Sequence, residues 1–184
     1  METVIAAFER EDTAQKFRGL LETAGGMKCL ICTSGSQVRR ALSAQQVYCV
    51  VAGVRLSDGP SEWLCADLPP ACALLLVGPR HQLDLCASPD VFKLAVPIRR
   101  EEAVNAVSLL CQYGRRVERL LRRRTDSDRE LIDRAKAALM RRCDMSEEEA
   151  HRALQKRSMN SGCRLVQTAR KILAGEEKER GKDG

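Results

Sequence analysis

Basic side chains recur through the last third of the sequence, where they outnumber acidic ones. Residues 115–184 hold 20 of the 31 lysines and arginines but only 13 of the 25 aspartates and glutamates. Cationic side chains on a surface can neutralise phosphate groups, so this segment is suited to bind a polyanion. The same charges equally suit a solvated surface of salt-bridged helices. The candidate contact residues are Arg129, Arg134, Lys136, Arg141, Arg142, Arg152, Lys156, Arg157, Asn160, Arg164, Arg170 and Lys171.

Residue types that carry catalysis or bind metals are not grouped in this sequence. Neither of the two histidines, His81 and His151, has a nucleophile or a carboxylate pair beside it, so we expect no enzyme and no cofactor. Cys29 and Cys32 have the spacing of half a zinc or redox site, but no second pair of this spacing follows. Most of the nine cysteines lie in apolar runs, as expected of small buried residues in a reduced cytoplasmic protein.

Three short amphipathic helices are expected between residues 127 and 174. In the first and third, apolar residues recur at i, i+1, i+4, i+7 and i+8, starting from Leu131 and Leu165, and the second repeats part of this pattern. The expected caps are Ser127 with Glu130, Ser146 with Glu149, Ser161 at the third helix, and Gly175 at its end. Three such helices must pack together to bury their stripes, which predicts a very small bundle attached to a larger domain.

The segment 127–174 resembles the ANTAR domain, an RNA-binding output module. The residues that match are Ile132, Ala135, Lys136, Leu139, Met140, Ser146, Glu147, Glu149, Ala150, Leu154, Ser158, Met159, Leu165, Val166, Ala169 and Ile172. His151 departs from the family, which often has an aromatic residue there. The resemblance implies a dimer that holds an RNA structure competing with a terminator hairpin. Because no aromatic residue follows Tyr113, recognition would use backbone contacts, loop shape and side chains such as Asn160 at base edges.

The first 100 residues alternate short apolar runs with amphipathic segments. Strands are expected at 3–8, 27–32, 47–54, 73–77 and 91–96, and helices at 12–23, at 36–44 and from residue 100. Apolar strands that alternate with helices indicate βαβ units and a parallel sheet covered on both faces. The predicted fold class is therefore α/β, with a flavodoxin-like doubly wound parallel sheet, a helical linker and a three-helix C-terminal bundle.

This front half resembles a response-regulator receiver domain of two-component systems, through its topology, residues 55–59 and residues 96–98. The resemblance places Gly53 at the phosphoacceptor aspartate, Val96 at the conserved lysine and Phe8 at one of the metal-binding acids. Glycine has no side chain that could accept a phosphoryl group. We therefore expect a pseudo-receiver that keeps the fold without phosphotransfer or metal binding, although a shifted alignment would offer Glu9 and Glu11.

The stretch between the two halves predicts a helical linker with an apolar seam. Val107, Leu110, Val117 and Leu121 recur at three- and four-residue steps, as in a short coiled coil that joins two subunits. The same residues could instead close the receiver as its last helix. The expected domains are 1–100 (pseudo-receiver), 101–126 (linker), 127–175 (ANTAR-like) and 176–184 (disordered tail). Neither a signal peptide nor a membrane-spanning run is recognised, which indicates a cytoplasmic protein.

The function that we expect is phosphorylation-independent transcription antitermination, in which a dimer binds structured leader RNA. Two other functions fit the same pattern. The helices could dock a protein partner and serve as an adaptor, or a small helical module could bind DNA as in a response-regulator-like protein. The sequence identifies neither the RNA nor the signal that would replace phosphorylation.

Overall fold

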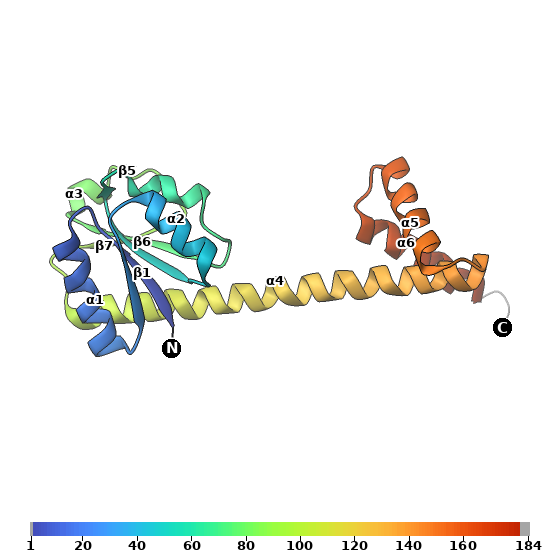
Figure 1. Cartoon of the computed structure of the whole chain (residues 1–184), viewed down its shortest axis with the longest axis horizontal. Helices are drawn as coiled ribbons and strands as arrows, with labels where there is room; N and C mark the ends of the chain where they lie inside the picture. Colours follow the sequence, from blue (N-terminus) through green and yellow to red (C-terminus); the bar gives the residue numbers. More distant parts are fainter. Residues whose placement is uncertain (1, 181–184) are drawn as a thin grey trace. The chain divides into compact units, whose positions relative to one another are not determined.

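The computed structural model describes residues 2–180, and for residues 176–180 it describes the backbone alone. The chain forms two compact units, residues 1–119 and 120–184. The long helix α4 (Arg100–Cys143) begins in the first unit and ends in the second (Figure 1). Within the described residues, none of the helices combines the length and apolar character that a membrane crossing requires.

The first unit is built on a five-stranded parallel sheet. Its strands are β1 (Thr3–Ala7), β2 (Lys28–Cys32), β3 (Cys49–Gly53), β6 (Ala73–Gly78) and β7 (Val91–Ala95), in the order β2-β1-β3-β6-β7. The chain leaves β1 for the neighbouring β2 and then crosses back to β3 on its other side. This order reverses the winding direction once, so the predicted doubly wound, flavodoxin-like sheet is confirmed.

Both faces of the sheet are covered, because successive strand residues point to opposite sides. Val4 and Ala6 of β1 face one core with α1 (Glu11–Gly25) and α4, whereas Ile5 and Ala7 face the other. That second core is closed by α2 (Gly35–Ala44), the 3₁₀ helix η1 (Ser61–Ala66) and the single turn α3 (Arg80–Leu83). The alternation explains why the strands are apolar throughout their length.

The start of α4 is part of the first core and not of a free seam. Val107 and Leu110 are buried against the sheet, together with Cys111. The predicted intersubunit seam is therefore wrong at Val107 and Leu110, which serve the core of their own unit. Gly114 lies within the continuous α4, and a glycine fits there because a Cβ atom would clash with the carbonyl oxygen of Ala71.

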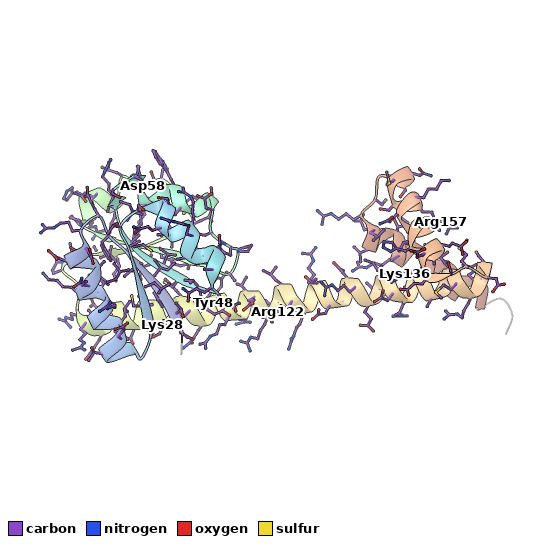
Figure 2. All side chains as sticks on the ribbon, in the orientation of Figure 1. Lys28, Tyr48, Asp58, Arg122, Lys136 and Arg157 are labelled. Carbon is purple, nitrogen blue, oxygen red and sulfur yellow. The ribbon has the colours of Figure 1, made fainter. Side chains whose placement is uncertain are left out.

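A small hairpin follows β3. It consists of β4 (Arg55–Leu56) and β5 (Gly59–Pro60), which pair antiparallel. Between them, the Asp58 carboxylate accepts hydrogen bonds from the backbone N–H groups of Gly35 (2.7 Å) and Ser36 (3.1 Å). These bonds at the N-terminus of α2 lower the pKa of Asp58. Asp58 therefore anchors α2 to the hairpin (Figure 2).

The second unit consists of the end of α4, α5 (Glu147–Ser161) and α6 (Leu165–Arg180). Its small core contains Ala135, Ala138, Leu139, Ala150, Leu154, Ala169 and Ile172. Alanines at these contacts let the helices approach closely, and the side chains of Leu139, Leu154 and Ile172 are buried among them. The predicted three-helix packing is thus present, although its first helix is the last part of α4.

Of the predicted helix caps, one is present and three are not. The capping box of Ser146 and Glu149 is present, with both reciprocal hydrogen bonds at the start of α5. The one at Ser127 is wrong, because Ser127 lies inside the continuous α4. Ser161 is the last residue of α5 and Gly175 lies within α6, so neither has its predicted capping role. Residues 176–180 belong to α6, and the rest of the predicted tail, 181–184, lies outside the described residues.

Candidate nucleic-acid interface

The second unit displays the predicted contact residues on all three of its helices. Arg129, Arg134, Lys136, Arg141 and Arg142 lie on α4, Arg152, Lys156, Arg157 and Asn160 on α5, and Arg170 and Lys171 on α6, with Arg164 just before it. All of them are exposed except Lys136, which is half-buried. The ion pairs that each basic residue forms within the protein determine whether its charge is available to a ligand.

Lys136 is engaged in holding the unit together. Its ammonium group lies 2.7 Å from Asp133 on the same helix and 3.0 Å from Glu147 at the start of α5. Hydrogen bonds to Asp133 and then to Glu147 raise the pKa of Lys136, so it stays charged and paired. We therefore assign Lys136 a clamp role between α4 and α5 rather than contact with a polyanion (Figure 2).

Two more of the predicted cations have acidic neighbours at longer range. Arg152 lies 3.7 Å from Glu148 and Arg170 lies 3.8 Å from Asp128. Both arginines are well exposed, so these pairs are screened by solvent and are weak. Each arginine could exchange its carboxylate for a phosphate at little energetic cost.

An open basin is lined by residues from all three helices of the second unit. We call it the basic basin; it has a volume of about 520 Å³ and is lined by Arg142, Arg157, Asn160, Ser161, Thr168, Lys171, Ile172 and Gly175. Three cations from three different helices line it, and among the described side chains none of the lining residues is acidic. The described part of the lining is therefore positively charged.

Four of the eight lining residues were predicted as contact residues and four were missed. Ser161, Thr168, Ile172 and Gly175 carry no charge, so a search for lysine and arginine does not find them. One of the missed residues, Thr168, could have been noticed in the sequence, since it is a polar residue on the apolar stripe of its helix. Its side chain is buried with 5 % exposure at the floor of the basin.

The loop between α5 and α6 is held by side chains beside the basin. The Ser158 hydroxyl donates to the Cys163 carbonyl (2.6 Å), and the Gln167 side chain accepts from the backbone N–H of Arg164 (3.2 Å). The Lys171 ammonium lies 3.3 Å from the Cys163 sulfur. The Ser161 hydroxyl and then Lys171 lower the pKa of the Cys163 thiol. These contacts fix the wall from which Lys171 faces the basin.

Gly53, which the resemblance places at the phosphoacceptor, has an aromatic neighbour in the first unit. Gly53 ends β3, and the ring of Phe8 packs beside it, stacked on Phe17 with a centroid distance of 4.8 Å. Val96 is half-exposed where a lysine was sought. An aromatic ring therefore lies beside Gly53.

The Cys29 and Cys32 pair does not form a common site. Cys29 packs into the core on one face of the sheet and Cys32 into the core on the other. Burial raises the pKa of Cys29 to about 11 and also raises that of Cys32, so both thiols are protonated at neutral pH. Among the described residues, the cysteines form no disulfide and no group of three potential ligands could hold a metal ion.

Comparison with known proteins gives two domain assignments. Residues 121–173 match the family model of the ANTAR domain. The first unit resembles solved receiver domains: one from an HD domain-containing protein of Pseudomonas fluorescens Pf-5 has 16% identity, covers 64% of this chain and 92% of that chain, and superposes with a TM-score of 0.57. A response regulator receiver domain protein from Clostridium thermocellum has 14% identity, coverages of 64% and 99%, and a TM-score of 0.57.

A receiver domain from Methylobacillus flagellatus gives similar values, with 20% identity, coverages of 60% and 98%, and a TM-score of 0.53. A search of curated proteins found no match to the chain. At these identities the structural likeness establishes the fold alone. The chain thus carries an ANTAR domain at residues 121–173, preceded by a unit with the fold of response regulator receiver domains.

Proposed function

We propose that this protein is an RNA-binding regulator of transcription antitermination and that its ANTAR domain binds structured leader RNA. The observation that carries the proposal is the basic basin, whose eight lining residues all lie in the second unit. Arg142, Arg157 and Lys171 carry positive charge there, and the described lining side chains include no carboxylate. Such a surface gains affinity for RNA by releasing counterions from its phosphates.

The proposed RNA surface extends from the basin over the neighbouring exposed cations. Within the described side chains, Arg129, Arg134, Lys156 and Arg164 form no ion pair and would be ready to meet phosphates. Arg152 and Arg170 would join them by exchanging weak carboxylate partners. Lys136 is left out of the surface, since its charge is used between α4 and α5.

We further propose that phosphorylation does not control the protein. Phosphotransfer to a receiver needs a carboxylate nucleophile, a metal ion that neutralises charge, and a cation that holds the product. Gly53, Phe8 and Val96 stand at the positions where the resemblance would place these groups. Asp58, the acidic residue nearest the turn, is committed to the N-terminus of α2. The regulatory input would be a ligand, a partner protein or expression level in the cytoplasm.

The RNA-binding form is proposed to be a homodimer that uses α4. Val107 and Leu110 are excluded from the contact by their burial, but Leu120 and Leu121 are exposed by 57% and 43%, and Val117 is half-buried. Adjacent exposed leucines on a helix otherwise rich in arginine are suited to pack against a second copy. The proposed seam therefore runs through Val117, Leu120 and Leu121.

A protein-adaptor function is the second candidate, and one surface of the first unit favours it. Phe92, Leu109 and Tyr113 are large apolar residues that are exposed by 47%, 66% and 57%. Phe92 and Tyr113 also line a cavity of about 480 Å³ together with Pro69 and Pro70. Exposed aromatic and apolar groups of this kind are common at protein contacts. This surface is compatible with RNA binding by the other unit.

Filter binding of the full chain to an RNA hairpin pool, duplex DNA and heparin, each at several salt concentrations, tests the proposal. We expect tighter binding to RNA than to DNA of equal length, with a steep loss of affinity as salt rises. Equal affinity for all three polyanions would mean that the basic surface is not an RNA site. Tighter binding to duplex DNA would favour the DNA-binding alternative.

A further inference from the structure

The basic basin contains two hydroxyl groups whose protons are already used. The Ser161 hydroxyl donates to the carbonyl oxygen of Ser158 (3.3 Å), and the Thr168 hydroxyl donates to the carbonyl oxygen of Arg164 (3.4 Å). A hydroxyl has one proton to give and two lone pairs to offer. Both oxygens therefore offer the basin only acceptor capacity, so the occupant must bring hydrogen-bond donors of its own.

The other lining residues indicate the charge and the polarity of the molecule that would bind in the basin. Arg157, which forms no ion pair among the described side chains, favours a negatively charged occupant, as do the nearby positive charges of Arg142 and Lys171, and Ile172 adds an apolar patch to the lining. Gly175 leaves the basin open, because a Cβ atom there would have nothing within 4 Å. Asn160 can both donate and accept. The occupant is thus an anion that also carries donors and one flat or apolar part.

From these features we infer that the basic basin holds one unpaired ribonucleotide of the RNA and reads its 2′-hydroxyl. The phosphate would lie among Arg142, Arg157 and Lys171, and the base over Ile172 and Gly175. Its 2′-hydroxyl donates to Thr168 or Ser161. The inference rests on the proposed RNA-binding function and adds which part of the RNA is recognised and why DNA is rejected.

Size and shape favour an unpaired nucleotide over a paired one. A volume of about 520 Å³ lies in the usual range of small-molecule sites and leaves ample room for a single nucleotide. Bases in a duplex are stacked and cannot enter a basin, whereas bases in loops and bulges can turn outward. An inorganic phosphate would satisfy the cations but has no flat or apolar part to lie over Ile172.

The test uses the full chain and a pool of RNA hairpins with one fixed stem and a randomised loop. A second pool has the same stem but 2′-deoxynucleotides throughout the loop. The parent protein should bind the all-RNA pool more tightly. Thr168→Val keeps the shape of the side chain and removes its hydroxyl, so it should reduce this preference about fivefold, the effect of one hydrogen bond.

Two matched pairs of variants separate the basin from the rest of the surface. Thr125→Val also removes a hydroxyl that donates to a helix carbonyl, but outside the basin, and should leave the ribose preference unchanged. Gly175→Leu fills the basin without changing charge and should weaken hairpin binding at least tenfold. Ala174→Leu, at an exposed neighbour outside the lining, should not. Circular dichroism checks that all four variants are folded.

Several results would overturn the inference. If the parent binds RNA but Thr168→Val and Gly175→Leu bind both pools as the parent does, the basin does not hold a nucleotide, and the proposed function stands. If Gly175→Leu weakens binding of polyglutamate as much as binding of RNA, the basin is a general anion site. A parent that binds no RNA at all would refute the proposed function and this inference with it.

Discussion

A Cβ atom built on Gly53 would lie only 3.2 Å from Cδ1 of Phe8. The Phe8 ring is buried, and it is stacked on Phe17, so it cannot easily move aside. A side chain at position 53 would therefore require this ring to shift. Gly53 and Phe8 fit each other in the present packing.

The first prediction follows from this contact. Incubation of the parent protein or of Gly53→Asp with Mg²⁺ and acetyl phosphate should leave the intact mass unchanged, because nucleophile, metal ligands and lysine cannot be restored by one change. Mass spectrometry measures the result, with an active receiver domain treated in parallel as the control. A gain of one phosphoryl mass, mapped to Asp58 or Glu9 in the parent, would contradict the pseudo-receiver assignment.

A second prediction concerns the clamp formed by Lys136. Lys136→Met removes the ion pairs to Asp133 and Glu147 and should lower the free energy of unfolding of the ANTAR unit by about 1 kcal/mol. The salt dependence of RNA binding should stay the same, because this charge does not face the ligand. Arg134→Met, an exposed change on the same helix, is the control for stability. If RNA binding by Lys136→Met depends less steeply on salt than that of the parent, Lys136 contacts the RNA after all.

The strands of the first unit and the cap of α5 could be predicted from short stretches of the sequence. The five strands were predicted from apolar runs such as Val50–Ala52, and the capping box at Ser146 from its spacing to Glu149. At Ser127 the same spacing failed, because α4 continues through it and the serine stays exposed on the helix surface. A capping sequence allows a helix to start but does not force it to, and tertiary packing of the segments before and after it can keep the helix continuous.

The positive charge of the candidate site could be predicted from the sequence, but the ion pairs of its basic residues could not. Exposed cations such as Arg157 and Lys171 follow from composition and helix periodicity. The engagement of Lys136 with Glu147 could not be read from the sequence, because it depends on how α5 turns back onto α4. The role of Thr168 depends in the same way on the packing that makes it the floor of a basin. Long-range geometry was the missing information in both cases.

The third prediction concerns pH and the capping box. Hydrogen bonds from the backbone N–H and then the hydroxyl of Ser146 lower the pKa of Glu149 below 4.5. A carboxyl with a lowered pKa stabilises the fold above its unfolded pKa, and this contribution is lost as pH falls through the folded pKa. The parent should therefore exceed Glu149→Gln in stability at neutral pH, and the difference should shrink below about pH 4.5.

Urea unfolding monitored by circular dichroism at several pH values measures this difference. Glu130→Gln is the control, because Glu130 lies within α4 and caps no helix. Its stability relative to the parent should change little between neutral and acid pH. A difference between the parent and Glu149→Gln that grows as the solution becomes more acid would have the wrong sign and refute the capping argument.

The fourth prediction concerns the oligomeric state. Replacing Leu120 and Leu121 together with glutamate should convert the dimer to monomers, because two charges would be buried at the proposed seam. Light scattering at tens of micromolar gives the mass. Asp126→Lys changes a charge on another side of the same helix and should leave the dimer intact. A parent protein that is monomeric at this concentration would remove the dimer from the proposal.

The salt dependence of RNA binding by the double variant Arg157→Ala and Lys171→Ala tests the central claim most directly. These two residues lie on different helices and meet only at the basic basin. The plot of log K against log salt should become shallower by about 1.4 to 1.8, since each phosphate contact contributes roughly 0.7 in a single strand and 0.9 in a duplex. An unchanged slope and affinity, with unchanged circular dichroism, would show that RNA does not bind at the basin.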